Sequence, residues 1–215
     1  MPWRARSPVE SEVGFLAEGG WGVKVHCASA RMTDRPRAGP RHAVSMRSLP
    51  PPGPRDVERL GGKESVWDYP RPPRLEPVTA RIRITFGGVT IADTTGAFRV
   101  LETSHPPNYY LPPDDIAEGV LLRTDRGSWC EWKGEAHYYD VTAGGRTAPS
   151  AAWGYDQPTP TFEPIAGYVA FYAGPMDSCM VDGEPVVPQP GGFYGGWVAD
   201  AVTGPFKGTP GTDGW

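Results

Sequence analysis

Glycine and proline recur along this chain too often for long helices to form. The 215 residues include 28 Gly and 26 Pro, and proline ends helices because it lacks an N–H donor and clashes with the preceding turn. Short apolar segments separated by turns are typical of β structure. We therefore expect an all-β fold, either a compact antiparallel sandwich or a tent-like small barrel, with long ordered loops and at most one or two short helical turns.

The first part of the chain has the composition of a disordered arm. Residues 31–54 are mostly Arg, Pro and Gly with few large apolar side chains, so burial cannot offset the entropy lost on ordering. We expect residues 1–60 to form a disordered basic arm, with Met32 or Met46 as alternative starts. Residues 61–215 are expected to form a single β domain.

The charge of the chain argues against nucleic acid as a partner. Residues 1–62 hold ten Lys and Arg against six Asp and Glu, or +4; the totals of 21 and 25 then leave eleven against nineteen, or −8, for residues 63–215. A surface that binds phosphate backbones needs clustered Lys and Arg. An acidic β domain does not provide them.

Cysteine and hydropathy predict a cytoplasmic protein. Cys27, Cys130 and Cys179 are odd in number and far apart, unlike the disulfide framework of a small secreted domain. No stretch approaches the ~18–20 apolar residues of a membrane span, and the first thirty residues lack the apolar run of a signal peptide. We therefore expect no membrane partner.

Alternating side chains predict a β-hairpin near the start of the domain. In residues 80–86, Ile82, Ile84 and Phe86 fall on one face of a strand, with polar residues on the other. Gly87-Gly88 suits a two-residue turn, and residues 89–93 can return as the partner strand.

Further short segments complete the expected fold. Residues 64–74 suggest an extended strap, because their aromatic residues lie between prolines. Residues 112–116 suggest one helical turn, since proline begins it and acidic residues follow. The glycine-rich ribbon at residues 189–208 should wrap the core as an ordered loop. The remaining expected strands are 98–102, 120–123, 130–141, 151–155, 168–172 and 180–187, the last turning at Asp182-Gly183.

Several of these segments, in this order, resemble domain of unknown function family 427. They are 64–74, Ser104-His105-Pro106-Pro107-Asn108-Tyr109-Tyr110, Cys130-Glu131-Trp132-Lys133-Gly134, 167–172, Val181-Asp182-Gly183-Glu184 and 189–207. The resemblance covers residues 64–215 and implies a compact antiparallel β domain of bacteria and fungi. It also carries a nucleotidyltransferase-like label.

Nucleotidyl transfer is the less favoured hypothesis on the residues themselves. That chemistry needs carboxylates converging on Mg²⁺ beside a loop that holds phosphates. Asp114 and Asp115 are adjacent and cannot point the same way in an extended strand, and the Gly87-Gly88 turn has no accompanying Lys or Ser. The sequence therefore lacks the carboxylate and phosphate-binding motifs that the nucleotidyltransferase-like label would require.

His105 is the first candidate for chemistry. It lies on a proline-stiffened segment with Tyr109 and Tyr110 close behind, where an imidazole with a reference pKa near ~6.5 can act as a general acid or base. The alternative is a histidine that only caps a turn. Tyr109 would be its hydrogen-bond partner.

The segment from Cys130 to Lys133 is the second candidate. If Cys130 and Trp132 face inward along a strand, Glu131 and Lys133 face outward together and can present a charged pair to a ligand. An exposed ion pair without a binding role is the alternative. The cysteines themselves are expected to be buried and structural.

No metal or cofactor is expected. Structural zinc ligands normally come in pairs two to four residues apart, a spacing that this chain lacks, and His137 is interpreted as an exposed strand residue beside Tyr138. The sequence also contains no Gly-x-Ser-x-Gly motif, which hydrolases with a serine nucleophile use to expose that serine.

These segments together predict a pocket for an unidentified small molecule, with an enzymatic role left open. The rival hypothesis is a protein-interaction or homo-oligomerising module, a homodimer for example, that uses exposed aromatic and proline-rich segments. Burial of Trp67, Tyr69 and Trp197 would favour the pocket. The predicted catalytic residues are His105, Tyr109, Glu131 and Lys133, and the predicted ligand-binding residues are Tyr110, Trp132, Tyr138, Tyr194 and Trp197.

Overall fold

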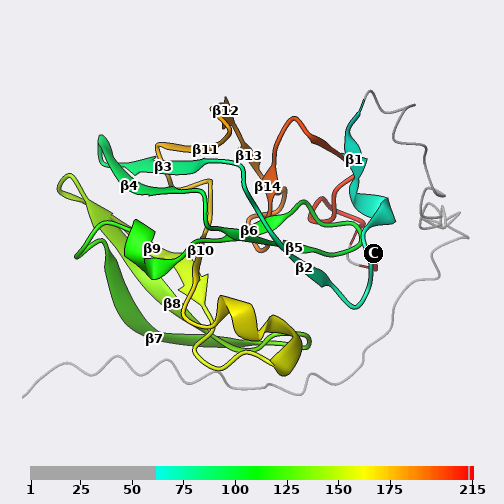
Figure 1. Cartoon of the computed structure of the whole chain (residues 1–215), viewed down its shortest axis with the longest axis horizontal. Coiled ribbons are helices and arrows are strands. Elements are labelled where there is room, and N and C mark those ends of the chain that lie inside the picture. Colours follow the sequence, from blue (N-terminus) through cyan, green and yellow to red (C-terminus); the bar gives the residue numbers. More distant parts are fainter. Residues whose placement is uncertain (1–61, 213) are drawn as a thin grey trace, which may run out of the picture. The chain divides into compact units, whose positions relative to one another are not determined.

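Strands arranged in five sheets are the main regular elements of the described chain (Figure 1). The computed structural model describes residues 62–212, 214 and 215, so the arm expected over residues 1–60 lies outside them. The all-β prediction is confirmed, although the described sheets do not close into a barrel. Three short 3-10 helices occur, one more than expected, and none of the described helices is long and apolar enough to cross a bilayer.

The strands β7 to β10 form a four-stranded antiparallel sheet (Figure 1). Its order is β10-β9-β8-β7, with β7 at Leu121–Cys130, β8 at Gly134–Ala143, β9 at Arg146–Gly154 and β10 at Val169–Phe171. Successive side chains of a strand point to opposite faces. Val169 and Phe171 therefore join one core cluster and Ala170 joins another, so β10 is buried on both faces.

The second sheet contains the hairpin that the alternating pattern predicted. Its order is β12-β11-β3-β4, with β3 at Ile82–Phe86, β4 at Val89–Thr94, β11 at Ser178–Val181 and β12 at Glu184–Pro185. Ile82, Ile84 and Phe86 are buried as expected and pack in the largest core cluster. The Asp182-Gly183 turn joins β11 to β12, as predicted.

A third sheet brings two adjacent tyrosines to the junction of the core clusters. Its order is β2-β5-β6, with β2 at Arg74–Pro77, β5 at Phe98–Leu101 and β6 at Asn108–Tyr110. Leu111 and Val169 exchange backbone hydrogen bonds of 2.8 and 2.9 Å, which tie this sheet to β10. Tyr109 consequently points into one cluster and Tyr110 into the other.

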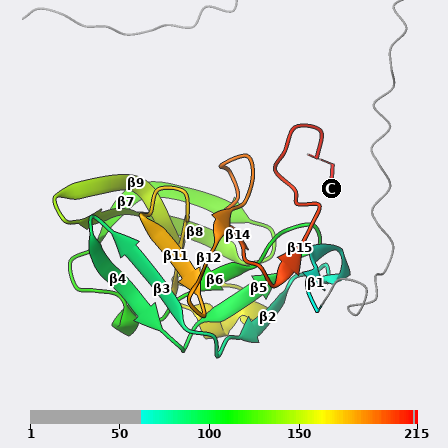
Figure 2. The same ribbon diagram turned by 90° about the horizontal axis from the view of Figure 1, so that it is seen from above.

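The strap and the glycine-rich ribbon are ordered and meet each other. In Figure 2, β1 (Glu64–Ser65) of the strap runs beside β15 (Val202–Thr203) of the ribbon, and the two pair in parallel. The other short elements are β13 (Val187–Pro188), β14 (Trp197–Val198), η2 (Val66–Asp68), η3 (Pro113–Asp115) and η4 (Pro160–Ile165). The helical turn expected at residues 112–116 corresponds to η3.

The strand predicted at residues 130–141 is wrong at its beginning. β7 runs from Leu121 through to Cys130, and a tight turn then leads into β8 at Gly134. Gly134 has φ +91°, a conformation that favours glycine at the end of a short hairpin loop. The segment Glu131–Lys133 is therefore a turn, and its side chains do not alternate as strand residues.

Two glycine turns lock the two larger sheets together. Gly87 in the β3–β4 turn and Gly144 in the β8–β9 turn both have positive φ, at +61° and +55°. A Cβ built on Gly144 would collide with the Gly87 carbonyl, whereas one on Gly145 would meet nothing within 4 Å. Only a residue without a side chain permits this approach of the two turns.

Replacement of Gly144 by Ala should destabilise the domain more than replacement of Gly145, which has φ +73°. Both variants place a side chain in left-handed backbone, at about 1–2 kcal/mol. Gly144→Ala should lose about 1–3 kcal/mol more because it also separates the turns. Urea unfolding of both variants measures the difference, and equal losses would contradict the proposed packing.

Candidate functional site

A cavity of about 710 Å³ lies over the aromatic face of the β7–β10 sheet. Its wall comes from the β5–β6 loop, the β7–β8 hairpin, β9 and the glycine-rich ribbon. Segments that are distant in sequence therefore meet on one side of the domain. The predicted residues that line this cavity are His105, Tyr110, Glu131, Trp132, Lys133, Tyr138 and Tyr194.

The β7–β8 turn places Lys133 in the cavity wall. Thr159, which precedes η4, holds this turn in place: its N–H donates to the Lys133 carbonyl at 3.2 Å and its hydroxyl to the Trp132 carbonyl at 2.6 Å. The Lys133 side chain is buried, with only 7% of the residue exposed. Its ammonium lies 5.5 Å from the centre of the Phe162 ring and 5.8 Å from that of Tyr155.

The Lys133 ammonium is a buried cation without a carboxylate partner. No ion pair within 4.0 Å among the described residues includes it. Burial by itself lowers the pKa of Lys133, but the nearby Tyr110, Cys130 and Glu102 outweigh burial and raise this pKa above its ordinary value. Lys133 is therefore charged at neutral pH, and aromatic faces compensate a buried charge only in part.

Gln189 determines the tautomer of His105. The Gly196 N–H donates to the Gln189 side-chain carbonyl at 3.2 Å, which orients the amide nitrogen toward the Lys207 carbonyl at 2.9 Å and His105 Nδ1 at 3.0 Å. An amide nitrogen is only a donor, so Nδ1 must accept. The neutral imidazole therefore carries its proton on Nε2, which makes His105 a hydrogen-bond donor at that atom.

Burial and neighbouring cations keep His105 neutral. The residue is 6% exposed, and its ring packs edge-on against Tyr194 with centroids 4.6 Å apart. Burial, followed by the charges of Lys207 and Arg71, lowers the pKa of His105 from 6.5 to about 4. The imidazole is therefore uncharged at neutral pH.

Aromatic side chains form the floor of the cavity. Trp153 on β9 donates from its indole N–H to the Tyr110 hydroxyl at 3.3 Å, and their ring centroids lie 6.3 Å apart. Tyr138 on β8 shares a 2.9 Å hydrogen bond with Ser128 across the hairpin. Tyr172 packs against Trp153 with centroids 4.6 Å apart. Such a floor offers ring faces to an apolar or planar ligand group.

Two buried polar atoms near these residues lack partners among the described residues. They are the indole N–H of Trp132, which lines the cavity, and the hydroxyl of Ser104 beside His105. Ser104 also has φ +71°, a left-handed conformation that is uncommon outside glycine. Unpaired buried groups and strained backbone concentrate at functional sites.

Tyr109 and Trp197 do not belong to the cavity, contrary to prediction. The Tyr109 ring lies in the main core, 5.3 Å from that of Trp197, because β6 turns alternate residues to opposite faces. Trp197 is fully buried there and donates to the Phe171 carbonyl at 2.8 Å. The hydrogen-bond partner of His105 is therefore Gln189, and Tyr109 has a packing role.

The expected outward pair of Glu131 and Lys133 is also wrong. Because these residues are in a turn, Glu131 is exposed at the rim while Lys133 is buried. His137 is likewise buried rather than exposed, and its Nε2 lies 2.8 Å from the Tyr139 hydroxyl. Cys179 is buried as predicted, and burial raises its thiol pKa to about 12; Cys130 instead lines the cavity.

The cavity collects positive charge within an acidic domain. Its cationic residues are Arg71, Arg126, Lys133 and Lys207, and its carboxylates are Glu102 and Glu131. Arg71 pairs with Glu102 at 3.2 Å, and the Arg126 guanidinium lies 4.3 Å from the Tyr138 ring centre. Sequence reasoning missed Arg71, Arg126, Lys207 and Gln189. One signal was available, because Lys207 is the only Lys or Arg after Arg146.

The described residues contain no group of three or more His, Cys, Asp or Glu placed to hold a metal ion. Residues in the cavity lining carry donors instead: the Lys133 ammonium, the His105 Nε2–H and the Trp132 indole N–H, which is itself a buried atom. A lining that offers these donors suits a ligand with negatively charged oxygen atoms.

Acidification should destabilise the domain through His105. The pKa of His105 is 6.5 in the unfolded chain and about 4 in the folded chain. Between these two pH values only the unfolded chain binds a proton at His105, so the free energy of unfolding falls as the pH falls. His105→Gln removes this effect. The difference in unfolding free energy between wild type and His105→Gln should shrink from pH 7 to pH 4.5 in urea titrations, and a constant difference would contradict the assignment.

Comparison with known proteins places the chain in a family. Comparison with curated proteins finds no match. The model of a family described as a domain of unknown function (DUF427) matches residues 74–182, just over half of the chain. The match contains His105 and Lys133, and ends before Gln189 and Lys207. The chain therefore belongs to the DUF427 family, as the resemblance of its segments indicated.

Proposed function

We propose that the cavity binds a small organic anion, with Lys133 as its charged contact. The observation that carries this proposal is the burial of an ammonium with no carboxylate partner in the described residues. A buried charge without a partner is expensive to keep. A carboxylate or phosphate group of a ligand would supply the missing partner.

The neighbours of Lys133 support an anion in the same place. His105 offers a proton at Nε2, and the Trp132 indole N–H is buried with no described partner. Lys207 adds positive charge, with its ammonium donating to the Trp215 carbonyl at 2.6 Å, whereas the charge of Arg71 is offset by Glu102. A local positive field of this kind attracts anions and repels cations.

His105 acts as a donor to the ligand in this proposal, and not as a general base. Its Nδ1 accepts from Gln189, its Nε2 carries the proton, and its low pKa disfavours the imidazolium. A neutral donor beside an ammonium can polarise a carboxylate or phosphate oxygen.

The two rival functions receive less support. The interaction module depends on exposed aromatic residues: Trp129 and Phe193 are 76% and 75% exposed. Of the three residues whose burial would favour the pocket, Tyr69 and Trp197 are buried and Trp67 is half-buried. Nucleotidyl transfer needs carboxylates for Mg²⁺, and one of the two at this cavity already pairs with Arg71. The anion site uses the observed donors without further groups.

Anions should stabilise the protein through Lys133. Thermal unfolding in acetate or inorganic phosphate, against chloride at matched ionic strength, should show a stabilisation that grows with concentration and reaches about 2.7 kcal/mol at a hundred times the dissociation constant. Lys133→Met should abolish it. Lys63→Met, which removes an equal charge from an exposed pair with Asp200, should retain it.

The folding of Lys133→Met provides the internal control. An apolar side chain of similar volume in the same aromatic surroundings should leave the unfolding free energy in chloride unchanged or higher, because no buried charge remains. Equal anion stabilisation in wild type and Lys133→Met would overturn the proposal.

A further inference from the structure

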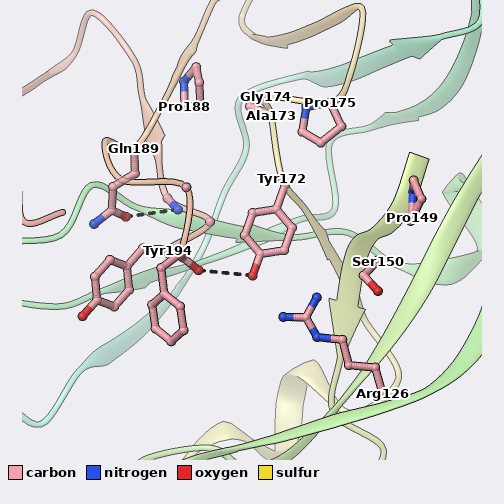
Figure 3. Close-up of a pocket in the computed structure, with 14 residues that line it drawn as sticks. Arg126, Pro149, Ser150, Tyr172, Ala173, Gly174, Pro175, Pro188, Gln189 and Tyr194 are labelled. Carbon is pink, nitrogen blue, oxygen red and sulfur yellow. Dashed lines mark hydrogen bonds between the residues drawn. The ribbon is translucent and has the colours of Figure 1, made fainter. Parts of the chain in front are cut away.

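A second hollow of about 560 Å³, whose lining residues are drawn in Figure 3, shares part of its lining with the cavity that contains Lys133. Figure 3 shows the rings of Pro149, Pro175 and Pro188 around it, with Ala173 and Gly174 between them. Proline has no N–H to donate, and Arg126 is the only charged residue in its lining. This hollow, which we call the proline hollow, is therefore suited to apolar groups.

The proline hollow and the anion cavity share one wall. The residues that line both are Arg126, Tyr172, Phe193, Tyr194 and Gly195. The Tyr172 hydroxyl donates to the Phe193 carbonyl at 3.3 Å, a bond drawn in Figure 3, and this holds the glycine-rich loop at the junction. A Cβ on Gly195 would overlap the Trp153 ring, so the loop rests directly on the cavity floor.

The two hollows, which share these lining residues, differ in polarity. At one end Lys133, His105 and Trp132 present donors, and at the other end proline rings and Ala173 present hydrocarbon. At the junction, aromatic rings can contact either a polar or an apolar part of a ligand; these rings belong to Tyr172, Phe193 and Tyr194. One molecule that satisfies both ends must itself be charged at one end and apolar at the other.

We infer that the natural ligand is an amphipathic anion, whose carboxylate or phosphate head binds at Lys133 and whose apolar portion lies in the proline hollow. The inference rests on the proposed function and adds the class of ligand. The cavity cations supply the head contact, and the second hollow supplies a place for hydrocarbon that an inorganic anion would leave unused.

A homologous series of anions tests the inference. The probes are straight-chain carboxylates from acetate to octanoate and monoalkyl phosphates of the same chain lengths, with dissociation constants from calorimetry or thermal shifts below the micellar range. Each methylene that enters the hollow should tighten binding about fourfold. The gain should begin once the chain reaches the junction and stop when the hollow is full. Comparison of the carboxylate series with the phosphate series shows which head group binds more tightly.

Gly174→Leu should remove the gain without removing the head contact. A Cβ at Gly174 would meet only the Pro188 ring, at 3.9 and 4.0 Å, so a larger side chain can extend into the hollow. The variant should bind long and short anions with similar affinity, and Gly174→Ala should retain most of the gain. Lys133→Met should bind neither short nor long anions.

The outcomes separate this inference from the proposal beneath it. If short anions bind through Lys133 but affinity does not rise with chain length, or rises equally in Gly174→Leu, the amphipathic ligand is wrong and the anion site stands. If the rise with chain length persists in Lys133→Met, head and tail do not share one ligand. If no probe binds through Lys133, the anion site itself is wrong.

Discussion

Burial of both faces of the β8–β9–β10 layer decides which side chains meet in the cavity. One face packs against the β3–β4 hairpin through aliphatic residues such as Val141 and Val169. The opposite face carries Tyr138 and Trp153. Strand periodicity allows no intermediate arrangement, because a shift of one residue would exchange the two sets. The aromatic floor is therefore the second face of the sheet that organises the core.

This floor explains why a lysine can be held inside the domain. The turn that carries Lys133 is hydrogen-bonded to Thr159, and the ammonium lies among Tyr155 and Phe162 rather than carboxylates. A buried charge in such surroundings lowers the free energy of unfolding, but it is shielded from solvent. The same logic applies to His105, whose neutral, oriented imidazole depends on Gln189 from the ribbon. Both groups are positioned by backbone segments that meet only after folding.

The elements that sequence could predict are those with local signals. The β3–β4 hairpin followed from alternation and a Gly-Gly turn. The alternation over residues 130–141 predicts one continuous strand, but Gly134 has a positive φ and ends a turn. Residues 131–133 therefore do not follow the alternation of a strand.

Other features had no local signal at all. Tyr109 and Tyr110 are adjacent, and only the placement of β6 between two core clusters decides that Tyr110 faces the cavity. Burial of Lys133 and His137 contradicts the usual exposure of such residues, and it depends on neighbours far along the chain. Gln189 became visible as a partner of His105 only through tertiary contact.

The central claim is that an anion binds at Lys133, and anomalous diffraction tests it most directly. Crystals of the protein grown with selenate, a tetrahedral oxyanion with a strong anomalous signal, should show a selenium peak within about 4 Å of Lys133 Nζ, because one selenate oxygen accepts from the ammonium at hydrogen-bond distance, and His105 and Trp132 should lie beside it. Selenate peaks confined to exposed arginines and lysines, with none beside Lys133, would contradict the account.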